Sequence, residues 1–137
     1  MKKISILFIF IFFQNLYATN MHNLSLLAEQ GNPSAQYKLG LFYKNNKREL
    51  GHAFLWIHKS ALKGYTPAQY EFALMFHYGL GVRQNSELAQ LWFTRAARRG
   101  DPRAKSILYR FYAGKKINYS TRKYHQYYSQ NFRTIRQ

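Results

Sequence analysis

The 137-residue sequence has no cysteine, only three prolines and only five acidic residues, against 21 lysines and arginines. Without cysteine, a disulfide framework and a thiolate metal site are both excluded. The five carboxylates provide little material for acid and base catalysis, and no two are spaced as such a pair within one predicted element. These five residues are Glu29, Glu49, Glu71, Glu87 and Asp101.

The histidines and serines do not supply a catalytic or metal site either. His52 and His58 fall on one predicted helix but lie six residues apart, or about 240° around its axis, so they cannot share a metal. The other histidines, His22, His77 and His125, are solitary. No serine lies in the glycine context of a nucleophile elbow. We therefore predict a non-enzymatic protein with no catalytic residue, no metal and no cofactor.

The chain also lacks an apolar run of the roughly 20 residues that span a bilayer as a helix. Its only long apolar stretch, residues 4–13, follows Lys2 and Lys3 and precedes a small residue, Ala18. A basic start, a short apolar segment and a small residue are typical of a secretory signal peptide. We predict a signal peptide over residues 1–18, cleavage after Ala18, and a periplasmic or secreted protein that stays strongly basic. An uncleaved amino-terminal anchor is the alternative.

Between Ala68 and Gly100 the apolar residues recur at helical spacing in two segments. Gly79 and Gly81 separate the segments, and Asn85 or Ser86 can cap the second. The pattern predicts an antiparallel pair of helices. Its apolar positions are Ala68, Phe72 and Phe76 in the first helix, and Leu88, Ala89, Trp92, Phe93, Ala96 and Ala97 in the second.

This pair is one unit of a repeat. Gly31, Gly64 and Gly100 lie 33 and then 36 residues apart, each with alanine three residues before it and four residues after it. The extra three residues fall in a turn, where residues 44–52 lack the Gly-x-Gly-Val of residues 79–82, so helix packing is unaffected. The equivalent apolar positions are Leu39, Phe72 and Leu108; Tyr43, Phe76 and Tyr112; Ala53 and Ala89; and Trp56 and Trp92. We predict that both tryptophans belong to the core.

A cap residue followed by proline marks the start of each first helix, at Asn32-Pro33, Thr66-Pro67 and Asp101-Pro102. Before the first of these, residues 19–31 predict an amino-terminal capping helix. After the third unit, residues 113–137 are basic and rich in tyrosine. They predict a degenerate last helix that closes the repeat array, with a basic tail as the alternative.

The pattern of Ala-x-x-Gly, Leu39-Gly40, Gly-x-Gly-Val and Ala-x-x-Trp resembles the Sel-1-like repeat, a subclass of the tetratricopeptide-like helical repeats. The resemblance extends over about residues 26–112. It departs at Ala73, where the pattern expects glycine, and in the first unit, which lacks the glycine turn. It implies an all-α fold, a right-handed α-solenoid of antiparallel helix pairs, with about two full units and the start of a third over residues 32–112.

By the same resemblance, the first helix of each unit lines a concave groove that binds a ligand. The groove residues would be Tyr37, Leu41 and Lys44; Tyr70, Leu74 and His77; and Ser106, Arg110 and Ala113. Tyrosine rings beside leucine and cationic groups suit an extended peptide or a glycan-like chain. Packing between neighbouring units is the alternative role for the two tyrosines.

A second candidate surface is basic. A dense positive charge speeds association with anionic partners through its long-range field. The predicted basic surface consists of Arg95, Arg98, Arg99, Arg103, Lys115, Lys116, Arg122 and Lys123.

Together these features predict an exported adaptor that binds an acidic protein or peptide through the groove, with oligomeric state open. A polyanion-binding module for anionic lipid, cell-wall polymer or nucleic acid is the first alternative, although export disfavours nucleic acid. An envelope hydrolase is the least favoured alternative, and the charge can also lack any ligand.

Overall fold

The computed structural model describes residues 2–114 and contains only helices over that range. This confirms the predicted all-α class. The predicted last helix after residue 114 lies outside the described residues. The helices are α1 (Lys2–Glu29), α2 (Pro33–Asn45), the short 3-10 helix η1 (Lys47–Glu49), α3 (Leu50–Leu62), α4 (Thr66–Tyr78), α5 (Ser86–Arg98) and α6 (Pro102–Tyr112).

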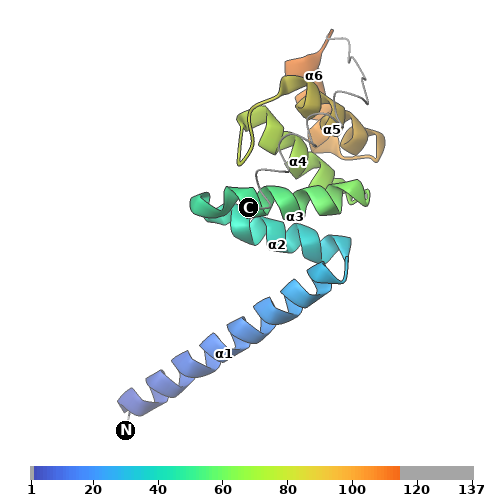
Figure 1. Cartoon of the computed structure of the whole chain (residues 1–137). Coiled ribbons are helices and arrows are strands. Elements are labelled where there is room, and N and C mark those ends of the chain that lie inside the picture. Colours follow the sequence, from blue (N-terminus) through green and yellow to red (C-terminus); the bar gives the residue numbers. More distant parts are fainter. Residues whose placement is uncertain (1, 115–137) are drawn as a thin grey trace.

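The helices from α2 to α6 stack in chain order, each packed on the helix before it (Figure 1). The pairs α2 with α3 and α4 with α5 are the two predicted repeat units. The long helix α1 leaves this stack at an angle, and only its last part packs on α2, through Ala28 and Leu24. It runs without a break through Ala18, where cleavage is predicted.

The caps at the unit junctions follow the prediction in two cases and differ in the third. The side chain of Asn32 accepts a hydrogen bond from the amide of Ala35, and Asp101 caps α6 in the same way. The prediction that Thr66 caps α4 is wrong. Tyr65 occupies that position without a side-chain cap, because it is the residue directly after the repeat glycine, as Asn32 and Asp101 are.

Aromatic side chains from α3, α4 and α5 form the main core. Trp92 is fully buried, and its ring meets that of Phe72 edge to face at 4.9 Å between centroids. Trp56, at the equivalent place in the first unit, is half-buried against a smaller cluster that includes Ala28 and Leu39. The core role is therefore confirmed for Trp92, while Trp56 keeps part of its surface exposed.

Close approach of the helices within a unit depends on one small residue. At Gly40 a Cβ atom would lie 2.5 Å from the side chain of Ile57 on α3. Ala73, also fully buried, takes this position in the second unit. In α6 the same position holds Tyr109, which is 84% exposed. The third unit therefore carries a large side chain where the first two units carry a small one.

His58 on α3 stacks between two core rings, 6.3 Å from Phe54 and 5.0 Å from Phe72 between centroids. Burial lowers the pKa of His58 to about 4, from its usual value of 6.5. The unfolded chain therefore binds a proton on His58 at a higher pH than the folded chain does. It follows that this histidine stabilises the fold fully above pH 6.5 and progressively less as the pH falls towards 4.

We expect the free energy of unfolding to drop by on the order of 2 to 3 kcal/mol between pH 7 and pH 4.5 because of this histidine. Urea unfolding followed by circular dichroism at several pH values measures the change. His58→Phe keeps an aromatic ring in the stack and removes the titration, so its pH dependence over this range should be much flatter. An unchanged slope in that variant would assign the effect to other groups.

Candidate binding groove

Side chains join the first helices of the two units across the predicted groove. Lys44 at the end of α2 pairs with Glu71 on α4, with 2.5 Å between Nζ and Oε2, and both side chains are largely buried. Near the other end of α2, the ring of Tyr37 contacts that of Tyr65 at 5.4 Å between centroids. The ion pair thus joins α2 to α4, and the ring contact joins α2 to Tyr65, the residue directly before α4.

Arg103 performs the same task between α4 and α6. Its guanidinium lies over the ring of Tyr70, 4.2 Å from the centroid. It also donates two hydrogen bonds to the carboxylate of Asp101, 3.2 Å from Nε to Oδ1 and 2.7 Å from Nη2 to Oδ2. The hydrogen bonds from Arg103 lower the pKa of Asp101, so this carboxylate is ionised at neutral pH. Arg103 is thus fixed in place and electrically neutralised.

The two tyrosines of this face are half-buried and fixed by neighbouring units. Burial raises the pKa of both Tyr37 and Tyr70, and the negative charge of Glu71 adds to the effect at Tyr37. Both hydroxyl groups are therefore protonated at neutral pH and can donate hydrogen bonds. Tyr37 and Tyr70 therefore both pack against neighbouring units and keep part of their surface exposed to a ligand.

His77 is less available to a ligand than the sequence predicts, because it contacts α6. Its Nδ1 lies 2.8 Å from the hydroxyl of Tyr112, and its ring lies 5.4 Å from that of Phe111 on α6. Leu74 packs against the core and Leu41 is half-buried. Arg110 is exposed on α6.

The structure therefore brings Tyr37, Lys44 and Tyr70 together on one face and adds Arg103 to them. We name this part of the predicted groove, formed by Tyr37, Lys44, Tyr70, Glu71 and Arg103, the tyrosine groove. Sequence reasoning missed Glu71, although a carboxylate among so many basic residues was a signal for an ion pair. It placed Arg103 with the basic surface instead, because periodicity alone does not show which neighbouring helix a side chain reaches.

The rest of the predicted basic surface is separate from this groove. Arg95, Arg98 and Arg99 lie at the end of α5, beside the turn between α3 and α4. Lys115, Lys116, Arg122 and Lys123 lie outside the described residues. Among the described residues there is no cluster of three or more potential metal ligands.

The repeated helix pairs, with each helix packed on the one before it, define the class of α-solenoid repeat proteins. The family model of the Sel1 repeat matches residues 33–65 and 66–101, about half of the chain, and the protein belongs to this family. The matched segments begin at the first residues of α2 and α4, so they coincide with the structural units.

Three similar proteins place the chain among known members of this class. A Sel1 repeat protein from Oxalobacter formigenes superposes with a TM-score of 0.63 at 32% identity, over 65% of this chain and 69% of that one. A protective antigen present in uropathogenic Escherichia coli strains, which displays an SLR fold, superposes with a TM-score of 0.61 at 28% identity. That match covers 81% of this chain and 25% of the antigen.

The third is chitin synthase regulatory factor 3 of Schizosaccharomyces pombe, 41% identical over 69 residues. These residues make up 50% of this chain and 7% of that relative, so the likeness covers only a small part of the relative.

Within the described part of the chain, no helix is both long enough and apolar enough to cross a membrane.

Proposed function

We propose that this protein is an exported adaptor that binds an extended segment of another protein in the tyrosine groove. Sel1 repeats form helical modules for protein-protein interaction, which supports a binding role. The observation that carries the proposal is the pair of half-buried tyrosines on successive first helices: Tyr37 contacts the ring of Tyr65, and Tyr70 lies under the guanidinium of Arg103.

Fixed tyrosines suit such a role for two reasons. A large ring held by its neighbours loses little side-chain entropy when a partner binds, so more of the contact energy appears as affinity. Each hydroxyl can donate to a backbone carbonyl of an extended peptide while the ring contacts its side chains. The name of the fungal relative describes it as a regulatory factor of a synthase, which is a role that a binding protein can fill.

The expected acidity of the partner depends on long-range charge rather than on ion pairs in the groove. Lys44 is neutralised by Glu71, and Arg103 by Asp101, so neither cation needs a carboxylate from the partner. The net charge of +16 still attracts acidic surfaces at a distance. We therefore propose that charge accelerates the encounter with an acidic protein and that the tyrosine rings determine specificity.

Export is part of the same proposal and is supported by the sequence of residues 1–18. Expression with a carboxy-terminal tag in a Gram-negative host would test it. A periplasmic product whose mass corresponds to cleavage after Ala18 is expected, and a full-length product in the cytoplasm would contradict it.

We expect Tyr37→Ala/Tyr70→Ala to weaken peptide binding at least tenfold, because it removes both rings from the groove. The probe is a peptide selected on the wild-type protein from a displayed random library, with affinity measured by isothermal titration calorimetry. A ring at an interface hot spot accounts for about 2 kcal/mol or more, which exceeds the energy of a tenfold change.

Tyr109→Ala is the matched control, since it removes a ring from the most exposed tyrosine of α6. It should leave the affinity within about twofold. Tyr37→Phe/Tyr70→Phe separates the hydroxyl from the ring. Equal affinity of the wild type and the alanine double variant, with unchanged helicity, would refute the groove assignment.

A further inference from the structure

A second recess lies away from the groove, where the turn between α3 and α4 meets the end of α5. It has a volume of about 390 Å³, within the roughly 300 to 1,000 Å³ of small-ligand sites. Four of its lining residues are cationic and none is acidic: Lys63, Arg95, Arg98 and Arg99. We name these four residues and the recess they line the cationic pocket.

Two of the arginines lie close to neighbouring parts of the stack. Arg95 lies over the face of Trp92, 4.5 Å from the ring centroid. Arg99 lies against Gly64, so closely that a Cβ atom there would be 2.8 Å from its Nη2. Gly64 therefore leaves the room that the guanidinium occupies. Contact with Trp92 restricts Arg95 before any ligand arrives, so less entropy is lost in ordering its guanidinium.

Lys63 donates a hydrogen bond from Nζ to the carbonyl oxygen of Gly31, after the end of α1. The arginines of the pocket, by contrast, are not needed to cap the ends of α3 and α5. The last carbonyls of α3, those of Ser60 and Ala61, accept hydrogen bonds from the amides of Lys63, Gly64 and Tyr65. The last carbonyls of α5 accept in the same way from the amides of residues 99–101. Backbone hydrogen bonds thus serve these carbonyls, and the guanidinium groups of Arg98 and Arg99 are not required there.

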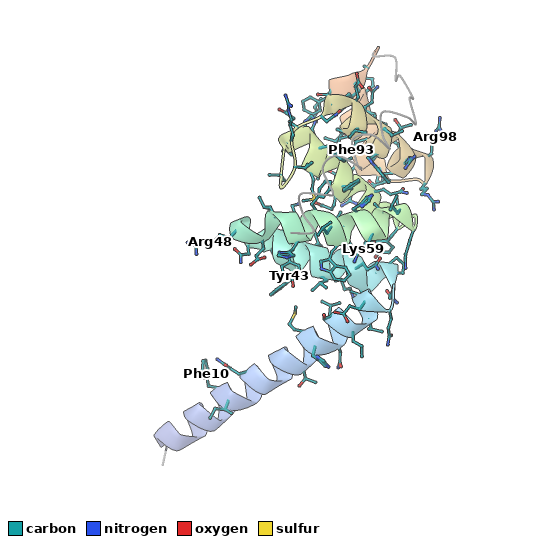
Figure 2. The ribbon with its side chains drawn as sticks, viewed as in Figure 1. Phe10, Tyr43, Arg48, Lys59, Phe93 and Arg98 are labelled. Carbon is teal, nitrogen blue, oxygen red and sulfur yellow. The ribbon has the colours of Figure 1, made fainter. Side chains whose placement is uncertain are left out.

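Within the described residues, neither Arg98 nor Arg99 forms an ion pair, in contrast to Lys44 and Arg103 in the groove. Both are exposed, and Figure 2 shows Arg98 pointing outward at the edge of the stack. Uncompensated like charges repel one another, and a bound anion removes that repulsion. The planar fork of arginine also matches the oxygens of phosphate in a bidentate arrangement.

We propose that the cationic pocket binds a phosphate monoester group, either free in solution or as a lipid headgroup. A phosphate dianion matches several neighbouring cations better than a single carboxylate does, because it offers more charge and more acceptor oxygens. The site goes beyond the proposed adaptor function and is independent of it, since none of its lining residues belongs to the tyrosine groove.

The test is isothermal titration of the full chain with inorganic phosphate at low ionic strength. We expect saturable binding at one site, and at least tenfold weaker binding by Arg98→Gln/Arg99→Gln. The matched control is Lys38→Gln/Arg48→Gln, which removes the same charge from exposed residues outside the pocket. Arg48 lies on the opposite side of the stack from Arg98 (Figure 2). The control should change the affinity by no more than about threefold.

Equal weakening by the two double variants would show attraction to the overall charge only and would overturn the proposal, as would the absence of saturable binding. Circular dichroism checks that the variants are folded. If the glutamine variant is not, Arg98→Lys/Arg99→Lys keeps the charge, loses the bidentate fork and should bind phosphate with intermediate affinity.

Sedimentation with phosphatidylcholine vesicles, with and without phosphatidic acid, distinguishes the two sources of phosphate. Binding to phosphatidic acid that is lost in Arg98→Gln/Arg99→Gln supports a lipid headgroup as the ligand. Phosphate binding without sedimentation supports a soluble phosphate compound.

Discussion

Replacing Trp92 by alanine is expected to lower the free energy of unfolding by about 3 to 5 kcal/mol, the usual cost of removing a buried tryptophan. The indole is fully buried and meets the ring of Phe72 edge to face, with 4.9 Å between centroids. The guanidinium of Arg95 lies over the indole, 4.5 Å from its centroid. A loss of this size is a large part of the 5 to 15 kcal/mol that stabilises a typical domain. Urea unfolding of the purified variant, followed by circular dichroism, measures it as a lower midpoint.

Trp56→Ala is the natural comparison, because Trp56 occupies the equivalent place in the first unit. It is half-buried, and Lys59 lies over its ring at 4.3 Å just as Arg95 lies over Trp92. Its removal should cost about half as much. Equal losses would mean that the two units bury their tryptophans alike in solution, contrary to the difference in the structure.

The same pair of residues shows why the fold could be predicted from the sequence. In a solenoid each helix packs mainly on its neighbours, so a residue's burial depends on its position within the unit and on whether a unit follows. The spacing of Gly31, Gly64 and Gly100 establishes that position for every residue between them. The helix pairs and the burial of Trp92 can be predicted from this position within the unit alone.

The start of α4 shows where a local sequence signal gives the wrong cap residue. Thr66-Pro67 looks like a cap followed by proline, yet the helix begins at Thr66 and Tyr65 takes the cap position. The number of residues after the repeat glycine determines the start of the helix, because the glycine turn and the packed alanine four residues later are fixed by neighbouring helices. The position within the repeat therefore determines where the helix starts, even where a neighbouring residue is the better cap.

The groove could be predicted only in part. Helical periodicity places Tyr37, Tyr70 and His77 on one face, but it does not tell how far successive units are rotated. That rotation decides that Arg103 reaches Tyr70 and that His77 meets Tyr112. It also brings Lys44 to Glu71, 27 residues away in sequence. Contacts between units therefore could not be predicted from the sequence, whereas contacts within a unit could.

Gly81→Ala is expected to be the most damaging change of a single small residue, with a loss of about 3 kcal/mol or more. Gly81 has a φ of +69°, in the left-handed region, which costs a residue with a Cβ roughly 1 to 2 kcal/mol. The added Cβ would also lie 2.4 Å from the carbonyl oxygen of Leu50 and 2.7 Å from its carbonyl carbon. These are backbone atoms at the start of α3, so the clash cannot be relieved by a side-chain rotation, and overpacking adds roughly 1 to 3 kcal/mol.

Gly100→Ala separates the two causes. Gly100 also has a positive φ, of +93°, but a Cβ there would meet no atom within 4 Å. Its substitution should therefore cost only the backbone strain, roughly 1 to 2 kcal/mol, in the same urea unfolding experiment. The difference between the two variants then measures the contact between the Gly-x-Gly-Val turn and α3. If both variants lose the same amount, that turn does not press against the preceding unit, and the glycine is there for its backbone conformation alone.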